Sequence, residues 1–494
     1  MRWLGANISR ETRRRVVLCL ALFALAFTVR FLTAQFIARH ITDPAWFPYG
    51  IYAIFDDQAQ DIMEGRAPAF WVEDALSSPR AATAAVYPPG YSLWLAVIYR
   101  VSDSRSALTV QKIQMTLDAL FVLLIAGVGA SVFGWRAGFM AGVLAALSPL
   151  LAFYGATPLA DSPTAWIVTG GAWMLLTGMK RLSWRLALGA GVMLGASCWL
   201  RANALLLGVW CAVALLFLVK ANWRTALRLS GVFTLGVLLL VVPVIVRNSR
   251  AFHAFVPGGM GFGTNLWEGL GETSRAGEFG AVFGDANVVE QERAEMGLAP
   301  DAPLALYWPD GLQRDRARMR KALAVIRAHP FWFAGVMAKR MAGMLKYAGE
   351  PVAYMGTAGI NVTSAKSLPP ERQGGILGFL VNILGMLQSV LRYLLLPLMI
   401  VGTLLGLRRD WRACALVYTI ILYYLVVGSV LHTELRYGLP MQALLFIFAG
   451  LAVEIVWNLK SGVWSRKTKG KSDADSRRDF EVTDFRLQTP DFRL

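Results

Sequence analysis

The sequence has little charge and few of the residues that form disulfides or hold metals. Only 16% of its 494 residues are charged, and it contains four cysteines and four histidines. Cys19, Cys198, Cys211 and Cys414 lie within apolar runs, and no pair of them has the spacing of metal ligands. We therefore interpret the cysteines as small packing residues, and we predict neither a disulfide framework nor a dedicated metal cluster.

The charge that is present is mostly positive. Lysine and arginine total 49 against 32 aspartates and glutamates, which gives a formal net charge of +17. No RNA- or DNA-binding motif accompanies this excess, and charge alone is a weak indication of nucleic-acid binding. Basic residues of membrane proteins collect in cytoplasmic turns and beside anionic headgroups. We therefore expect membrane lipids, and no nucleic acid, as partners of this surface.

Apolar residues make up 56% of the chain, and many runs reach the roughly 20 residues that cross a bilayer. The predicted fold class is an all-α polytopic membrane protein with about ten transmembrane helices. The candidate spans are Val16–Phe36, Ala107–Phe133, Ala137–Tyr154, Pro163–Gly178, Leu186–Leu200, Ala204–Val219, Gly231–Val246, Tyr393–Leu407, Ala413–Leu431 and Leu439–Trp457.

Positive residues orient these spans, because cytoplasmic turns are enriched in lysine and arginine. Four arginines between Arg10 and Arg15 precede the first span, which we interpret as a retained helix and not as a cleaved signal peptide. An even number of spans puts the turns with Arg136, Lys180, Lys220 and Arg408 in the cytoplasm as well. Residues 374–388 are then interfacial or re-entrant, since two full spans within 374–407 would move the Arg408 turn outside.

This topology divides the chain into five parts. We predict a cytoplasmic N-terminus at residues 1–15 and a catalytic membrane core at 16–247, which includes a first extracytoplasmic loop at 37–106. Residues 248–373 form a second extracytoplasmic segment, with a basic amphipathic helix at Pro330–Tyr347. Residues 374–457 hold the last membrane helices. Residues 458–494 are polar and charged, and we predict a disordered cytoplasmic tail.

Several polar residues fall on the extracytoplasmic side in this topology. They are Asp56 and Asp57, Asp161, Arg201, Arg247 and Asn248, and His432, Glu434, Arg436 and Tyr437. Carboxylates can accept a proton from an attacking hydroxyl, and arginine pairs with phosphate oxygens through its planar fork. The combination indicates group transfer from a lipid phosphate. The simpler alternatives are a helix cap at Asp161, an arginine at position 201 that reaches the headgroups, and a solvated pair at Asp56-Asp57.

The chain resembles the integral-membrane GT-C glycosyltransferases, in particular the branch with the protein O-mannosyltransferases and the lipid A aminoarabinose transferase. The resemblance covers Val16 to Trp457. Its blocks are Asp56-Asp57, Tyr87-Pro-Pro-Gly-Tyr-Ser-Leu-Trp94, Ser148-Pro-Leu-Leu-Ala-Phe-Tyr154, Asp161, Gly195-Ala-Ser-Cys-Trp-Leu-Arg201, Val242-Pro-Val-Ile-Val-Arg-Asn248, Gly263-Thr-Asn-Leu-Trp-Glu-Gly269, His329-Pro-Phe-Trp332 and Arg436-Tyr-Gly-Leu-Pro440.

The resemblance implies a GT-C fold and a sugar donor of the polyprenyl-phosphate type, with inverting transfer on the periplasmic face of a bacterial inner membrane. It maps the general base onto Asp56 or Asp57 and a second acidic residue onto Asp161. By placement, Arg201, Arg247 and Arg436 are candidates to bind the donor phosphate, and Tyr87, Asn248, His432, Glu434 and Tyr437 to bind substrate. The acceptor is a lipid, a protein or a cell-envelope glycan. No cofactor is required, although Asp56-Asp57 could hold a divalent cation with the donor phosphate.

Two other functions compete with this one. An O-antigen ligase or polymerase also uses lipid-linked sugars, but it does not need an acidic loop after the first span. A transporter or flippase predicts internal repeats and ionisable groups at mid-membrane depth. We see no repeat between the halves, and apart from Asp118 the predicted spans contain few acidic residues.

Overall fold

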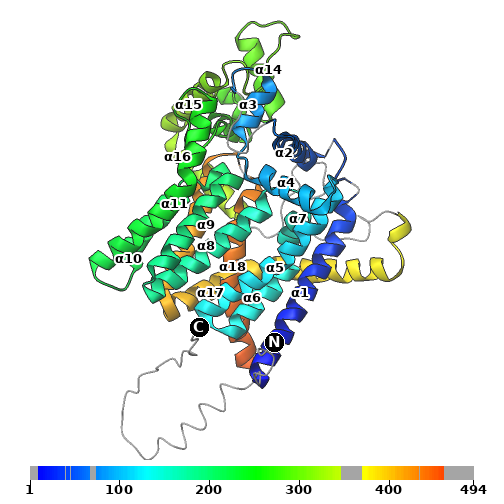
Figure 1. Ribbon diagram of the computed structural model, residues 1–494, viewed down its shortest axis with the longest axis vertical. Coiled ribbons are helices and arrows are strands. Elements are labelled where there is room, and N and C mark those ends of the chain that lie inside the picture. The colour runs from blue at the N-terminus through cyan, green and yellow to red at the C-terminus, as the bar shows by residue number, and fades with distance from the viewer. Residues whose placement is uncertain are drawn as a thin grey trace, which may run out of the picture.

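The structure is a computed structural model, and it describes residues 9–38, 40–44, 46–66, 74–345, 370–432 and 434–460. Within these ranges the chain is helical and forms no β-strand; a single isolated bridge joins Ala305 and Trp308. Long helices form a bundle, and shorter helices cover one of its ends (Figure 1). The predicted tail lies almost entirely outside the described residues.

The bundle is built from ten helices of the described chain. They are α1 (Arg10–Ile37), α5 (Ala107–Phe133), α6 (Trp135–Leu147), α7 (Pro149–Ala156), α8 (Asp161–Arg181), α9 (Trp184–Leu200), α10 (Leu207–Leu218), α11 (Trp223–Ala251), α17 (Gly375–Val430) and α18 (Leu439–Lys460). Serines begin several of them: the hydroxyls of Ser106, Ser148 and Ser183 each accept a hydrogen bond from a backbone N–H of the first turn.

Two groups of short helices cover the same end of the bundle, which we call the loop end (Figure 1). The first group follows α1 and consists of α2 (Phe47–Met63), α3 (Pro79–Val86) and α4 (Gly90–Ser102). The second group follows α11 and consists of α12 (Phe262–Gly271), α13 (Ala276–Phe279), α14 (Asp285–Glu295), α15 (Gly311–Ala328) and α16 (Pro330–Leu345). We call the second group the outer segment. Its helices lie within the predicted segment 248–373.

A multi-pass membrane protein is supported, but the count of ten spans is not confirmed. Five helices are long and apolar enough to cross a bilayer, or six if α6 and α7 together are one broken span. Those two helices meet at a 62° bend where Ser148-Pro149 interrupts the run that the sequence predicts as one span. The predicted spans at Leu186–Leu200 and Ala204–Val219 correspond to α9 and α10, which are shorter helices.

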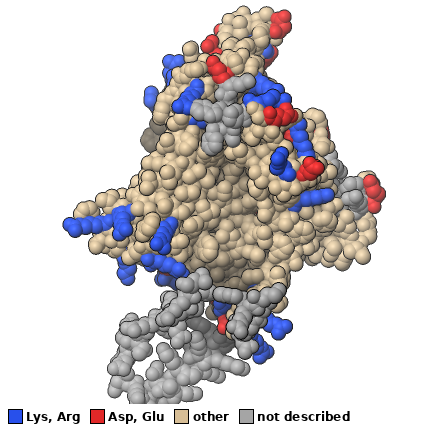
Figure 2. Space-filling view, in the orientation of Figure 1, with Lys and Arg blue, Asp and Glu red and all other residues tan. Residues whose placement is uncertain are grey.

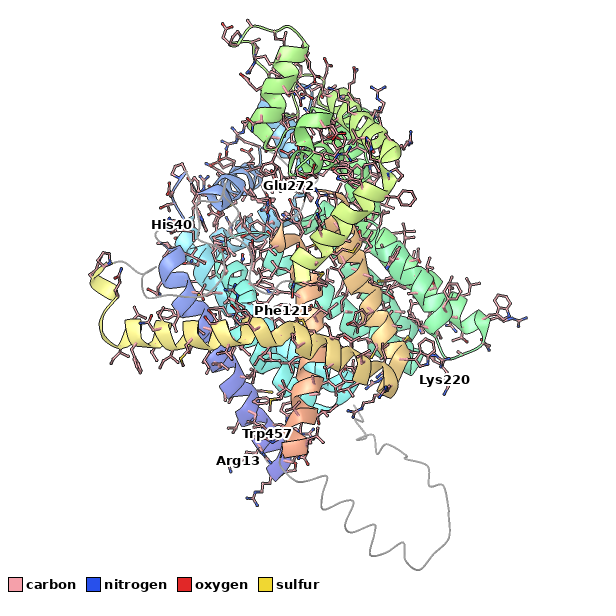
Figure 3. All side chains as sticks on the ribbon, turned by 180° about the vertical axis from the view of Figure 1, so that it is seen from behind. Arg13, His40, Phe121, Lys220, Glu272 and Trp457 are labelled. Atoms are coloured by element: carbon pink, nitrogen blue, oxygen red, sulfur yellow. The ribbon has the colours of Figure 1, made fainter. Side chains whose placement is uncertain are left out.

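Helix α17 differs most from the sequence prediction. It runs for 56 residues and changes direction at Asp410, whose backbone is not helical. The first part lies across the back of the bundle, and the part after Asp410 runs along it (Figure 3). The residues predicted to be a separate interfacial or re-entrant piece, 374–388, thus belong to the beginning of this helix, where Val381 and Leu384 pack against α1.

The basic turns meet at the end of the bundle opposite the loop end. The ammonium of Lys180 lies 3.1 Å from a carboxylate oxygen of Asp410, and Arg136 donates to the side chain of Asn458 at 3.5 Å. On the visible face, charged side chains gather toward the two ends and leave a broad uncharged band between them (Figure 2). This is the distribution expected of a protein whose middle faces hydrocarbon.

Candidate active site

The centre of the candidate site is an ion pair between α8 and the end of α9. A terminal nitrogen of Arg201 lies 2.8 Å from an oxygen of Asp161, and the Asp161 side chain is 1% exposed. Asp161 is the first residue of α8, where the partial positive charge of the helix N-terminus favours a carboxylate. Arg201 ends α9 in an extended conformation, with φ −145°. The short turn therefore directs the arginine toward Asp161.

A second buried ion pair lies beside the first one. Arg436 donates to an oxygen of Glu434 at 2.8 Å, and both residues are about 95% buried in the turn between α17 and α18. The guanidinium carbons of Arg201 and Arg436 lie 4.8 Å and 5.4 Å from the ring centroid of Tyr437, within the range of cation–π attraction. We call Asp161, Arg201, Glu434, Arg436 and Tyr437 the polar cluster.

His432 connects the polar cluster to the outer segment. One ring nitrogen lies 2.6 Å from Glu272 at the end of α12, and the other lies 3.2 Å from Glu434. Burial acts to lower the pKa of His432, but the hydrogen bonds and charges of the two carboxylates outweigh it and raise the pKa to about 9. Burial acts to raise the pKa of Glu434, and Arg436 and His432 lower it to about 2. His432 is therefore a charged link between the two carboxylates at neutral pH.

A carboxyl pair in the outer segment faces the same region. Glu268 on α12 and Asp285 on α14 share a hydrogen bond; burial and the charge of Asp285 raise the pKa of Glu268 to about 8. Part of Asp285 reaches solvent, but desolvation of its carboxyl by the surrounding protein raises its pKa too, against the lowering effects of Glu268 and His432. Because two adjacent carboxylates repel each other, the pair holds one proton near neutral pH. Neither residue was predicted from the sequence as a site residue, although Glu268 lies in the block Gly263-Thr-Asn-Leu-Trp-Glu-Gly269.

Contacts from α14 and α15 fix α12 in this position. Glu292 of α14 binds both Arg314 and Arg318 of α15, each through an N–O distance of 2.7 Å. Asp315 of α15 accepts a hydrogen bond from the backbone N–H of Thr264, at the start of α12, at 2.9 Å. All these charged side chains are buried, so the outer segment has an internal ionic core that holds Glu268 and Glu272 toward the bundle.

The acidic pair of the first loop does not join the polar cluster. Asp56 accepts hydrogen bonds from Tyr99 at 2.6 Å and from Arg105 at 2.8 Å. Asp57 is exposed, and no hydrogen bond or ion pair to it is found among the described residues. Both follow Phe55, whose buried ring packs edge-on against Tyr87 and Tyr91 at 5.5 Å and 5.1 Å. The aromatic face of α2 is thus buried, Asp56 faces Tyr99 and Arg105, and Asp57 faces solvent.

Arg247 and Asn248 shape the first loop. The guanidinium of Arg247 donates to the carbonyls of Ala84 and Ala85 at 3.2 Å and 3.3 Å, and to the side chain of Asn248 at 2.9 Å. Arg247 is buried, and its N–H groups point at the carbonyls at the end of α3, next to Tyr87. These contacts favour a structural role for Arg247 over a role in binding phosphate.

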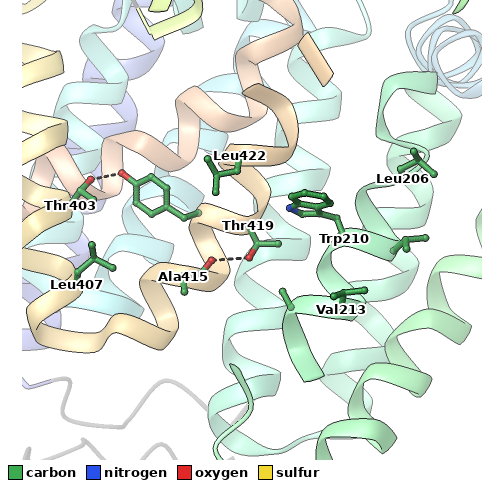
Figure 4. Close-up of a pocket in the computed structure, with 11 residues that line it drawn as sticks. Leu206, Trp210, Val213, Thr403, Leu407, Ala415, Thr419 and Leu422 are labelled. Atoms are coloured by element: carbon green, nitrogen blue, oxygen red, sulfur yellow. Dashed lines mark hydrogen bonds between the residues drawn. The ribbon is translucent and has the colours of Figure 1, made fainter. Parts of the chain in front are cut away.

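An apolar groove lies between α10 and α17, whose lining residues come from both sides of its bend at Asp410 (Figure 4). Its volume is about 800 Å³, and it is lined by Leu206, Val209, Trp210, Val213, Ala214, Thr403, Leu407, Ala415, Tyr418, Thr419 and Leu422. Its hydroxyls are paired internally: Tyr418 bonds Thr403, and Thr419 donates to a backbone carbonyl. The groove therefore suits an apolar ligand, because it has no unpaired hydroxyl to offer a polar one.

One residue ties this groove to the polar cluster. The hydroxyl of Tyr423 donates to the backbone carbonyl of Asn203 at 2.6 Å and accepts the N–H of Leu206 at 3.1 Å. Leu206 lines the groove, and Asn203 lies two residues after Arg201. The loop-end side of the groove is thus built on the same turn as the arginine.

Sequence reasoning missed a buried ion pair inside the bundle. Arg30 on α1 donates to Asp118 on α5 at 2.8 Å, and both side chains are within 1% of complete burial. The available signal was an ionisable residue inside each of two apolar runs, which is costly in a membrane and usually has a partner. Among the described residues, no group of three or more potential ligands is arranged to hold a metal ion.

Comparison of the sequence with family models and with curated proteins gives no match. Solved structures do match. The apo oligosaccharyltransferase of Archaeoglobus fulgidus is 13% identical, with a TM-score of 0.50 over 95% of this chain and 53% of that one. The same organism's AglB with an inhibitory peptide and dolichol-phosphate gives 0.46 at 13% identity, over 94% and 52%. ArnT from Cupriavidus metallidurans bound to undecaprenyl phosphate gives 0.35 at 15% identity, over 90% and 78%.

These identities are low, so the likeness to the apo oligosaccharyltransferase shows a shared fold. The chain spans about half the length of that enzyme.

Proposed function

We propose that this chain, whose fold is that of the GT-C membrane glycosyltransferases its motifs resemble, transfers a monosaccharide from a polyprenyl-phosphate donor. The acceptor is a hydroxyl or amine of a lipid, a protein or a cell-envelope glycan. The reaction takes place at the extracytoplasmic face of a bacterial inner membrane. The observation that carries this proposal is the polar cluster, which stands at the loop end beside an apolar groove.

Arg201 and Arg436 are the proposed ligands of the donor phosphate. They come from different turns, yet both guanidinium groups lie against the ring of Tyr437. Each also pairs with a carboxylate, which holds it in place before any ligand arrives. A preorganised pair of arginines can stabilise the negative charge that develops on a leaving phosphate without moving during the reaction. We expect no metal requirement, because the arginines supply the positive charge.

The groove between α10 and α17 is the proposed site of the isoprenoid chain. Its walls are mostly aliphatic, and an isoprenoid has only apolar surface to offer. Tyr423 places the loop-end side of this groove on the Arg201 turn. A lipid whose chain lay in the groove would therefore present its phosphate near Arg201.

A first-loop aspartate is the proposed general base. Asp56 is held by Tyr99 and Arg105, whereas Asp57 is exposed, and we assign the proton transfer to one of these two carboxylates. The acceptor oxygen forms a bond to the anomeric carbon as its proton passes to the carboxylate. The bond from that carbon to the phosphate oxygen breaks, and its electron pair leaves with the polyprenyl phosphate. Attack opposite the leaving group inverts the anomeric configuration.

Helices α12 and α14 of the outer segment are the proposed acceptor side. They place Glu268, Glu272 and Asp285 beside the polar cluster through His432. Tyr87 lies at the end of α3, within electrostatic range of Asp285 and of both cluster arginines. Together with Asn248, His432, Glu434 and Tyr437 it completes the set of residues that we assign to substrate binding.

Binding of undecaprenyl phosphate to the purified full chain in detergent tests the proposal, because that lipid is the expected by-product whichever sugar is transferred. The melting temperature is followed against lipid concentration. We expect saturable stabilisation of the wild type, as mass action requires of a ligand that binds the folded state. Arg201→Met and Arg436→Met should each shift the half-maximal concentration upward by about tenfold or more, the usual cost of a charged hydrogen bond.

Two controls make the outcome specific. Arg100→Met removes an exposed arginine at the end of α4 and should bind like the wild type. Dioleoyl phosphatidic acid offers a phosphate with two acyl chains in place of the isoprenoid, and it should bind more weakly. Equal stabilisation by both lipids, or equal loss in all three arginine variants, would contradict a dedicated polyprenyl-phosphate site. Treatment with a chelator should leave binding unchanged.

A further inference from the structure

Helix α5 carries a buried polar face. Gln111, Gln114 and Asp118 are spaced three and four residues apart, which puts them on the same side of an α-helix. Their exposed fractions are 4%, 0% and 1%. Buried polar groups at membrane depth need partners, because neither lipid nor water is there to satisfy them. We call these three residues the α5 polar face.

All three residues bind the segment that carries Asp161. Gln111 donates to the carbonyl of Ala156 at 2.9 Å, and Gln114 donates to the carbonyls of Thr157 and Leu159 at 2.6 Å and 3.2 Å. Ala156 is the last residue of α7, and Thr157 and Leu159 lie in the turn between α7 and α8, so none of these carbonyls has a following turn of helix to bond it.

Asp118 continues the pattern one turn further along. It accepts hydrogen bonds from the hydroxyl of Ser162 and from the indole of Trp166, the latter at 2.8 Å. Ser162 follows Asp161 directly, so the carboxylate of Asp118 fixes the first turn of α8. The charge of Asp118 is balanced by Arg30, which also donates to the carbonyl of Ala146 at the end of α6.

The packing leaves little freedom at this point. A β-carbon added to Gly155 of α7 would lie 2.4 Å from an oxygen of Asp118. Only glycine allows the backbone of α7 to approach so closely. Helices α1, α5, α6, α7 and α8 therefore all meet around a single buried carboxylate.

The first loop reaches the same face through one hydroxyl. Tyr91 of α4 is fully buried and donates to the side-chain oxygen of Gln114 at 2.9 Å. Its ring packs on Phe55, which precedes the Asp56-Asp57 pair. A chain of direct contacts thus runs from α2 through Tyr91 and Gln114 to the Asp161 turn.

We propose that Gln111, Gln114 and Asp118 are positioning residues, which set the place of Asp161 and, through Tyr91, couple it to the first-loop helix that carries the aspartates. Asp161 in turn orients Arg201. The polar cluster and the first loop make no direct ion pair with each other among the described residues, so this buried hydrogen-bonded route links them, alongside the close packing of Gly90 on the backbone of Trp199. The inference rests on the proposed function only in treating Arg201 as a ligand of the donor phosphate.

Hydrogen exchange of the full chain in detergent, read by mass spectrometry, tests the structural step. Tyr91→Phe deletes one hydroxyl and leaves the ring in place. We expect amides of residues 154–162 to exchange about fivefold faster in this variant, the factor that corresponds to one lost hydrogen bond. Tyr418→Phe is the matched control: it also removes a paired hydroxyl from a tyrosine of the bundle, but its partner is Thr403 on α17. It should leave residues 154–162 unchanged.

Binding of undecaprenyl phosphate separates positioning from simple stabilisation. A positioning role predicts that Tyr91→Phe raises the half-maximal lipid concentration about fivefold while the ligand-free melting temperature stays close to that of the wild type. Gln114→Leu should show faster exchange at residues 154–162 and a higher half-maximal lipid concentration, each to a greater extent than Tyr91→Phe. Unchanged exchange at 154–162 overturns the inference, and so does faster exchange with unchanged lipid binding.

The two proposals fail in different ways. If the wild type binds no undecaprenyl phosphate, the proposed function is wrong. The exchange measurement then decides by itself whether the α5 polar face fixes the Asp161 turn.

Discussion

Raising the pH should loosen the contact between the outer segment and the polar cluster, and His432 should account for the change. This side chain is buried between Glu272 and Glu434, at 2.6 Å and 3.2 Å. Those carboxylates overcome the effect of burial and raise its pKa from 6.5 to about 9. A group with a raised pKa in the folded state contributes stability that is fully present below its unfolded pKa. That contribution is lost as the pH rises through the folded pKa.

The size of the effect follows from these two pKa values. At about 1.4 kcal/mol for each pH unit, the contribution of His432 is about 3 kcal/mol below pH 6.5 and disappears above pH 9. Unfolding entropies near 2 cal/mol/K for each residue give about 1 kcal/mol/K for a chain of this length. The corresponding change in melting temperature is therefore about 3 °C, and it is larger if only part of the chain unfolds.

The assay compares the wild type with His432→Gln from pH 6 to pH 10, by melting temperature in detergent. The variant loses packing at every pH, so the informative quantity is the difference between the two curves. That difference should be largest at pH 6 and should shrink by about 3 °C by pH 10. His253→Asn is the control, because His253 is exposed and has a positive φ that asparagine tolerates. Parallel curves for the wild type and His432→Gln would refute the assignment of a charged His432.

Three further results are expected. Gly402→Ala should destabilise the bundle by about 3 kcal/mol or more, because the new β-carbon would lie 1.8 Å from the carbonyl of Phe448; Gly231→Ala, with nothing within 4 Å, should be neutral or slightly stabilising in the same melting assay. Glu292→Gln leaves two buried arginines of α15 without their carboxylate and should cost about 3 to 5 kcal/mol, seen as faster proteolysis within residues 262–345. Glu268→Gln should melt higher than the wild type above pH 8 and not below pH 5, since the proton that holds Glu268 neutral is lost as the pH rises through about 8.

Much of the bundle could be predicted because its signals are local. The helix at Ala107–Phe133 has the predicted bounds, since Ser106 begins it and Gly134 ends it. The basic turns predicted which helix ends lie on the same side of the bundle. The contact between Lys180 and Asp410 agrees with that placement, because the two residues belong to two of these turns. The direction of α17 was not predictable in this way. Its path depends on close packing at single glycines such as Gly402, and hydropathy does not register such contacts.

The candidate site was predictable as a set of residues and not as an arrangement. The topology rightly put Asp161, Arg201 and Arg436 at one end, because each follows or precedes a span. The pairing of charges needs the angles of the turns, which the sequence does not give. The outward direction of Asp57 depends on which face of α2 is aromatic, and that face is visible in the sequence only once the helix is known to begin near Phe47.

Tyr423 makes the groove and the arginine turn parts of one mechanical unit. Its hydroxyl belongs to α17 and is bonded to Asn203 and Leu206 of the short segment between α9 and α10. Any change in the separation of α10 and α17 must therefore move that segment too. A molecule bound between these helices would therefore change the position of Arg201 without contacting it. The displacement of Arg201 would depend on how far the bound molecule separates α10 from α17.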